Sequence, residues 1–151
     1  MRAVRDKLRV RYLGYVVMPE HVHLLVLPQP CGSDPIPISC VLLQLKGASG
    51  HRGKAALRAV WREHRSLGTT ALDAWATAAG EKPFWKPRGY DFNVVQENTI
   101  MEKLNYIHDN PVRRGLVSRP ERWSWSSFRF YEAADPSLIA MDWDGSFPIE
   151  V

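Results

Sequence analysis

Two histidines at alternate positions are the first residues in this chain that could do chemistry. His21 and His23 lie in the run Met18-Pro-Glu-His-Val-His-Leu-Leu-Val26, whose apolar and β-branched surroundings predict a strand. Side chains at positions i and i+2 of a strand point to the same face, about 7 Å apart at the backbone. Two imidazoles that converge in this way can hold one divalent metal ion, whereas the plainer interpretation is a pair of surface histidines.

A tyrosine and an asparagine at helical spacing form a second candidate group. Apolar periodicity predicts a helix over 97–109, ended by the Asn-Pro pair that follows, and Tyr106 and Asn110 share one face of it. A phenol becomes a nucleophile only beside a base or a cation. A metal held by His21, His23 and the amide oxygen of Asn110 would supply that field and polarise a bound phosphate. The alternative is that Tyr106 packs at a helix edge and Asn110 only terminates the helix.

The histidines need a strand pair to position them. Residues 10–18 and 21–27 are predicted as two strands joined by a tight Pro19-Glu20 turn, or as one long strand with a kink. The proline-rich segment 28–37 predicts a loop.

Helical patterns dominate the middle of the chain. Ser39 is predicted to cap a helix that extends to the small residues of 47–53, which interrupt the pattern. Helical composition returns over 54–66 and over the Ala-rich segment 69–79, and a short hairpin is predicted over 83–95.

Length and composition predict one soluble domain over residues 1–151. Its core is expected over about 10–131, and the acidic, proline-punctuated segment 132–151 is expected to be a surface tail. No apolar run approaches the roughly 18 residues of a membrane span and the first residues lack a signal-peptide core, so a cytoplasmic protein is expected. Cys31 and Cys40 do not have zinc-ribbon spacing, which favours reduced thiols.

The charge balance is compatible with a nucleic-acid partner. The net charge is +4 and the isoelectric point is near 9.3. Basic residues are therefore candidate phosphate contacts, with a solvated surface charge as the alternative at each position. The predicted DNA-binding residues are Lys46, Arg52, Lys54, Arg113 and Arg114.

Two long motifs carry a resemblance to a known family. The run 18–26 resembles the His-hydrophobic-His strand of the single-tyrosine transposases. The run Tyr106-Ile-His-Asp-Asn-Pro-Val-Arg-Arg-Gly-Leu-Val117 resembles the nucleophile helix of their REP-associated branch, and the Trp-rich residues 119–131 are also similar to that branch. The resemblance covers roughly residues 10–131.

The resemblance implies both a fold and an activity. The fold would be α+β, with a ferredoxin-like antiparallel sheet and helices packed on it. His21 and His23 would be metal ligands, Asn110 would complete the site for Mg²⁺ or Mn²⁺, and Tyr106 would be the nucleophile. The enzyme would cleave single-stranded DNA, form a 5′-phosphotyrosine, release a 3′-hydroxyl and rejoin strands without ATP. The partner would be single-stranded DNA with palindromic or hairpin elements. The protein would act as a monomer or homodimer and would be associated with the nucleoid, not with a membrane.

Two departures from the family leave alternatives open. Family members usually begin with a further strand and most of a helix, whereas only nine residues precede Val10 here. The usual N-terminal strand is therefore expected to be missing, which would expose a sheet edge or have a dimer cover it. The segment from about 60 to 80 suggests a local insertion. One alternative is a non-catalytic, truncated DNA-binding relic. Another is an unrelated metal hydrolase, although 151 residues are too few for a (β/α)₈ barrel.

Overall fold

The computed structural model describes most of the chain, and it divides into two compact units. Met1–Pro37 and Phe92–Val151 form one unit, and Ile38–Asp91 forms the other. The residues that the structure describes are 5–7, 10–31, 34–64, 83–87, 89, 91–94, 96–147 and 149.

An antiparallel hairpin is the centre of the first unit. Strand β1 (Val10–Val17) pairs with strand β2 (Val22–Pro28), and Met18 N donates to His21 O at 2.8 Å to close the turn between them. The prediction of two strands joined by a two-residue Pro-Glu turn is confirmed. The register shifts between residues 12 and 14, which marks a β-bulge in β1.

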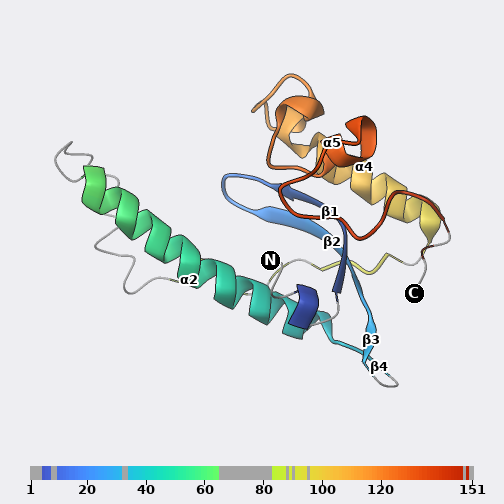
Figure 1. Ribbon diagram of the computed structural model, residues 1–151, viewed down its shortest axis with the longest axis horizontal. Coiled ribbons are helices and arrows are strands. Elements are labelled where there is room, and N and C mark those ends of the chain that lie inside the picture. Colours follow the sequence, from blue (N-terminus) through green and yellow to red (C-terminus); the bar gives the residue numbers. More distant parts are fainter. Residues whose placement is uncertain are drawn as a thin grey trace. The chain divides into compact units, whose positions relative to one another are not determined.

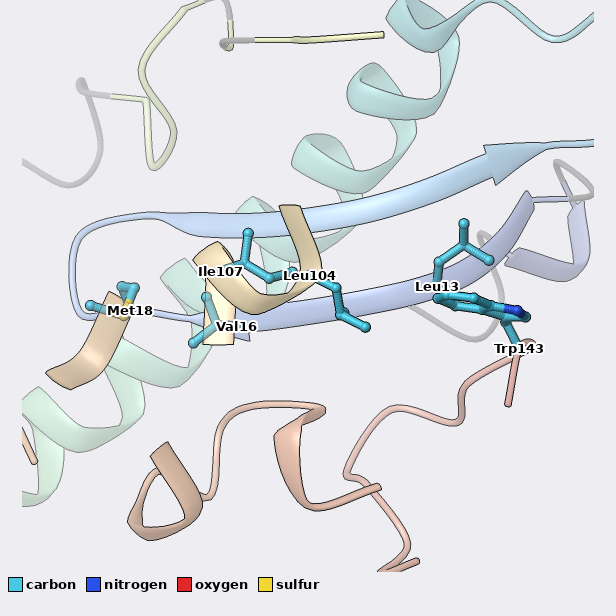
Figure 2. Packing of buried hydrophobic residues seen from close by; sticks show 6 residues of the cluster. All are labelled: Leu13, Val16, Met18, Leu104, Ile107 and Trp143. Carbon is cyan, nitrogen blue, oxygen red and sulfur yellow. The ribbon is translucent and has the colours of Figure 1, made fainter. Parts of the chain in front are cut away.

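One face of this hairpin packs against helix α4 (Glu97–Arg113). Leu104 and Ile107 from α4 meet Val16 of β1 in the buried core, as Figure 2 shows. A Cβ on Gly14 would collide with the Leu104 side chain, so the bulge needs glycine for the close approach of the helix. Figure 1 shows α4 lying along the hairpin.

Helix α4 continues beyond the predicted end at Asn110-Pro111, so that prediction is wrong. Pro111 lies inside the helix, which ends at Arg113. Gly115 adopts φ +68° and its N–H bonds to Val112 O, while Leu116 N bonds to Pro111 O. These two hydrogen bonds around a left-handed glycine form a Schellman motif, which satisfies the last carbonyls of the helix. The glycine, rather than the proline, is the stop signal.

The edge of β1 that faces away from β2 is covered by the C-terminal part of the chain. This part contains η2 (Pro120–Arg122) and α5 (Phe128–Ala133). Three backbone hydrogen bonds of 2.8–3.0 Å reach the strand: Val17 N to Trp125 O, Ser127 N to Tyr15 O, and Asp142 N to Tyr12 O. The exposed sheet edge that we expected is therefore occupied along β1.

The segment 132–151 does more than lie on the surface, so the expected surface tail is corrected. Trp143 is only 5% exposed and belongs to the core cluster, and Phe147 and Ile149 pack against it. Composition misled the prediction because the few apolar residues of this segment, not its acidic ones, decide where it packs.

Two further sequence predictions differ from the structure. Within the expected loop 28–37, β3 (Pro30–Cys31) and β4 (Asp34–Pro35) form a short antiparallel pair. The hairpin predicted over 83–95 is wrong, because the described residues of this range contain no strand.

The second unit is built on one long helix, α2 (Ile38–His64). Ser39 lies inside this helix rather than at its cap, and the predicted interruption at residues 47–53 does not occur. Its glycines have a packing role instead: a Cβ on Gly53 would collide with the Phe84 ring, and Gly50 lies against Trp85. The helix predicted over 69–79 lies outside the described residues.

The described elements are helices and antiparallel strands, so the α+β class with helices packed on an antiparallel sheet is confirmed. None of the helices in the described part is long and apolar enough to span a membrane.

Candidate functional site

The two histidines of the first motif converge. The Nε2 atoms of His21 and His23 are 3.1 Å apart, and the rings meet edge to face at a centroid distance of 4.7 Å. Two nitrogens that each bind one ion at about 2.1 Å are about 3.0–3.4 Å apart when they lie at 90–109° to each other. The donor pair therefore fits one divalent metal ion.

Strand alternation explains why the pair faces α4. His23 stands opposite Val16 in the register of the hairpin, and Val16 is a core residue on the face that α4 covers. Side chains directly opposite on an antiparallel pair share a face. Leu25, two residues beyond His23, packs against the same core. The half-buried position of His23 and the neighbouring charge of His21 lower the pKa of His23. A lowered pKa favours the neutral ring, which is the form that ligates metals.

Tyr106 lies beside the histidines. The Tyr106 and His23 rings are nearly perpendicular, with their centroids 6.1 Å apart. Arg113 also contacts the Tyr106 ring, with its Cζ atom 5.0 Å from the ring centroid. The tyrosine is 45% exposed, so a large substrate can reach its hydroxyl. The Tyr106 ring therefore has one imidazole and one guanidinium as neighbours.

Asn110 is one helical turn after Tyr106 and is nearly buried. Its Nδ2 donates to the Tyr106 carbonyl oxygen at 3.1 Å, which fixes the amide and leaves Oδ1 as the acceptor. Within the described part of the chain, no hydrogen bond joins Asn110 to either histidine. The structure thus brings His21, His23 and Tyr106 together and places Asn110 one turn after Tyr106 on α4.

No group of three or more His, Cys, Asp or Glu side chains in the described residues could hold a metal ion. Two imidazoles alone leave most positions of a six-coordinate ion open. An amide oxygen, water or another oxygen donor would have to fill them.

Glu20 is a residue of this site that the sequence interpretation missed. Its Oε1 pairs with Arg114 Nη2 and lies 3.4 Å from His21 Nδ1. Desolvation opposes ionisation of this carboxyl, but its own backbone N–H and the charges of Arg114 and His21 outweigh it and lower the pKa of Glu20. The available signal was its position directly before His21.

The predicted DNA-binding residues fall in both units. Arg113 and Arg114 belong to the unit that holds the histidines, at the end of α4. Lys46, Arg52 and Lys54 lie on α2 in the other unit. Lys46 Nζ donates to Lys86 O at 3.0 Å, and Arg52 is exposed.

A third histidine near the site has a different environment. His108 is 4% exposed, and its Nε2 lies 2.8 Å from Ser127 Oγ. The same hydroxyl donates to Tyr15 O at 3.2 Å and accepts from Tyr15 N at 2.9 Å. Since a hydroxyl has one proton, His108 is the donor to Ser127. Burial lowers the pKa of His108 to about 4. This cluster links α4 to the outer edge of β1.

Comparison with known proteins supports the resemblance in sequence. No family model matches the chain. It is 25% identical over 133 residues to the REP-associated tyrosine transposase of Escherichia coli (strain K12), covering 87% of this chain and 61% of that protein. It is 23% identical over 136 residues to a putative REP-associated tyrosine transposase of Haemophilus influenzae, covering 89% of this chain and 67% of that protein. The chain thus spans less than two thirds of the first relative.

The fold is also similar to a solved structure. A REP-associated tyrosine transposase bound to a REP hairpin matches with a TM-score of 0.55 at 22% identity, over 99% of this chain and 76% of the other. At this identity the likeness establishes the fold, which agrees with the fold class that the resemblance implied.

Proposed function

We propose that this chain, which resembles REP-associated tyrosine transposases in sequence and fold, cleaves and rejoins single-stranded DNA through a phosphotyrosine on Tyr106. The observation that carries the proposal is the convergence of two imidazole nitrogens, 3.1 Å apart, beside an exposed tyrosine. Three independent segments of sequence meet there: the hairpin turn, β2 and α4.

A divalent cation, Mg²⁺ or Mn²⁺, would be held by His21 and His23, with the Asn110 amide oxygen completing the set. When bound, such an ion polarises the scissile phosphate and offsets the charge that develops on it. The fold holds the two imidazoles in place, and Asn110 is fixed by its bond to the helix backbone.

Tyr106 supplies the nucleophile in this proposal. Its phenol loses the proton, the oxygen forms a bond to phosphorus, and the bond from phosphorus to the 3′ oxygen breaks. The 3′ oxygen leaves as a hydroxyl after taking up a proton, and the 5′ phosphate stays on the tyrosine. The reverse attack by a 3′-hydroxyl restores the phosphodiester, so rejoining needs no external energy source.

The proposed substrate is a single-stranded DNA that folds into a hairpin. The related solved structure is described as bound to a REP hairpin, which supports this class of partner. Arg113 and Arg114 lie at the end of the helix that carries Tyr106, where they can contact phosphates next to the cleaved bond. Lys46, Arg52 and Lys54 on α2 are proposed to extend the contact to the DNA.

The decisive experiment is adduct formation. Wild-type protein is incubated with hairpin-containing single-stranded DNA and Mn²⁺, and denaturing electrophoresis reports any covalent protein–DNA species. Tyr106→Phe keeps nearly the same volume and removes only the attacking oxygen. We expect an adduct with the wild type and none with Tyr106→Phe, while both proteins bind the DNA.

Tyr90→Phe is the control, because it makes the same chemical change at another tyrosine of the sequence. The control should form the adduct normally. An adduct in Tyr106→Phe would assign the nucleophile to another residue. A wild type that binds Mn²⁺ and DNA without forming an adduct would support the DNA-binding relic instead.

A further inference from the structure

A single carboxylate oxygen connects the metal-facing histidines to the helix of the nucleophile. Glu20 Oε1 lies in the hairpin turn, pairs with Arg114 Nη2 and lies 3.4 Å from His21 Nδ1. Arg114 is the C-cap of α4, the helix that also carries Tyr106 eight residues earlier. At 1.5 Å of rise per residue, the two positions are about 12 Å apart along one rigid element.

The carboxylate determines which nitrogen of His21 can bind a metal. A neutral imidazole has one proton, and a carboxylate beside Nδ1 favours the tautomer that carries the proton there. The lone pair is then on Nε2, which is the nitrogen that faces His23 at 3.1 Å. Partners of this kind orient ligating histidines in many metal sites.

The exposure of these groups argues against a mainly stabilising role. The side chains of Glu20 and Arg114 are 51% and 57% exposed. Ion pairs with this much solvent around them contribute little to the free energy of unfolding. The contact of one oxygen with both partners is therefore significant for orientation, not for stability.

We infer that Glu20 is a positioning residue that holds His21 in its metal-binding orientation and fixes it to the C-terminal end of α4 through Arg114. This inference rests on the proposed function and names a residue outside its ligand set and nucleophile. The alternative for Glu20 is an exposed charge without influence on the site.

The test measures metal affinity and stability separately. Mn²⁺ is titrated calorimetrically into the metal-free full chain without DNA, and the melting temperature is recorded without metal. Glu20→Ala is expected to weaken Mn²⁺ binding about 10- to 100-fold, the usual effect of losing such a partner, with the melting temperature close to that of the wild type. Glu20→Gln retains an amide oxygen that can accept from Nδ1 and should recover much of the affinity.

A second exposed ion pair of the same unit provides the matched control. Arg119 Nη1 and Glu121 Oε1 are 3.8 Å apart, with side-chain exposures of 73% and 47%. Glu121→Ala should change neither the affinity nor the melting temperature. Arg114→Gln should lower the Mn²⁺ affinity less than Glu20→Ala does. In this variant Glu20 retains its contact with His21 and loses only its ion pair with α4.

The outcomes separate this inference from the proposed function. Wild-type affinity in Glu20→Ala would overturn the inference alone, and so would an affinity loss that parallels a large fall in melting temperature. A wild-type chain that binds no Mn²⁺ would overturn the metal site and the inference together. The tyrosine adduct is scored in its own assay, so failure of Tyr106 chemistry leaves a distinct result.

Discussion

The histidine pair and His108 occupy two contrasting environments in the same unit. His21 and His23 are half-buried, and their Nε2 atoms face each other at 3.1 Å. His108 is almost fully buried and donates its proton to Ser127, whose hydroxyl is itself bonded to the β1 backbone. The Nε2 atoms of the pair face each other, whereas the Nε2 atom of the buried His108 is bonded to Ser127 Oγ.

The difference shows what identifies a functional histidine. Burial with complete internal partners indicates a structural role, because a buried polar group must be bonded. Two acceptor nitrogens held close together are unfavourable unless a proton or a metal lies between them. Such an arrangement is retained where it serves a ligand.

The largest expected effect is that substitutions in the two histidine environments affect different quantities, adduct formation in one and the free energy of unfolding in the other. His21→Ala should abolish Mn²⁺-dependent adduct formation and leave the free energy of unfolding within about 0.5 kcal/mol of the wild type. His108→Ala should instead lower that free energy by about 2–4 kcal/mol, through the cavity and the lost hydrogen bond to Ser127 Oγ. Gel assays and denaturant titration measure the two quantities.

The comparison fails if the effects are reversed. A folded His108→Ala protein that binds Mn²⁺ but forms no adduct would show that His108 takes part in the reaction. A stability loss in His21→Ala as large as that in His108→Ala would show that the pair is part of the core.

The second effect is the contribution of His108 to the pH dependence of stability. Its pKa is about 4 in the folded protein and near 6.5 when unfolded, so the unfolded chain binds the proton first as pH falls. Stability from this group is complete above about pH 6.5 and is lost as pH falls to about 4. The loss is about 3 kcal/mol at 1.36 kcal/mol per pKa unit.

Denaturant titration of the metal-free protein at several pH values measures this slope. The profile of His108→Gln should be flatter than that of the wild type between pH 6.5 and 4. Equal slopes in the two proteins would mean that other groups carry the acid sensitivity.

The smallest expected effect is on the salt dependence of DNA binding, after substitution of the predicted DNA-binding residues. Each phosphate contact that is removed should reduce the slope of log affinity against log salt by about one unit. Arg113→Gln and Arg52→Gln test one candidate in each unit, by fluorescence anisotropy with a hairpin oligonucleotide. His108→Gln is the control, with an unchanged slope. A slope unaffected by Arg52→Gln would exclude that residue of α2 from the DNA contact.

Much of the candidate site could be predicted from sequence, because short-range periodicity determines it. The spacing of His21 and His23 was enough to predict that their rings lie together, although only His23 lies within β2 and His21 precedes it in the turn. The spacing of Tyr106 and Asn110 placed them on one helix. The contact of the Glu20 carboxylate with Arg114 could not be predicted, because it joins residues 94 positions apart that no local pattern relates.

The fold was less predictable where local signals conflict with packing. Pro111 is a helix breaker by propensity, yet it is buried within α4, and a glycine four residues later ends the helix. The glycines at 50 and 53 look like breaks in α2, but aromatic rings fill the space beside them. In each case a tertiary contact overrides the local preference.

The hydrogen bonds between β1 and the segment that contains Asp142 also constrain the order in which the protein folds. Tyr12 N donates to the Asp142 carboxylate, a residue 130 positions later. Contacts of such sequence separation form late and slowly, because a long loop must close before they are gained. During synthesis the hairpin emerges early, with the outer edge of β1 open to pairing with another nascent chain. The segment that carries Asp142 therefore protects the outer edge of β1 only after it has been synthesised and has folded back.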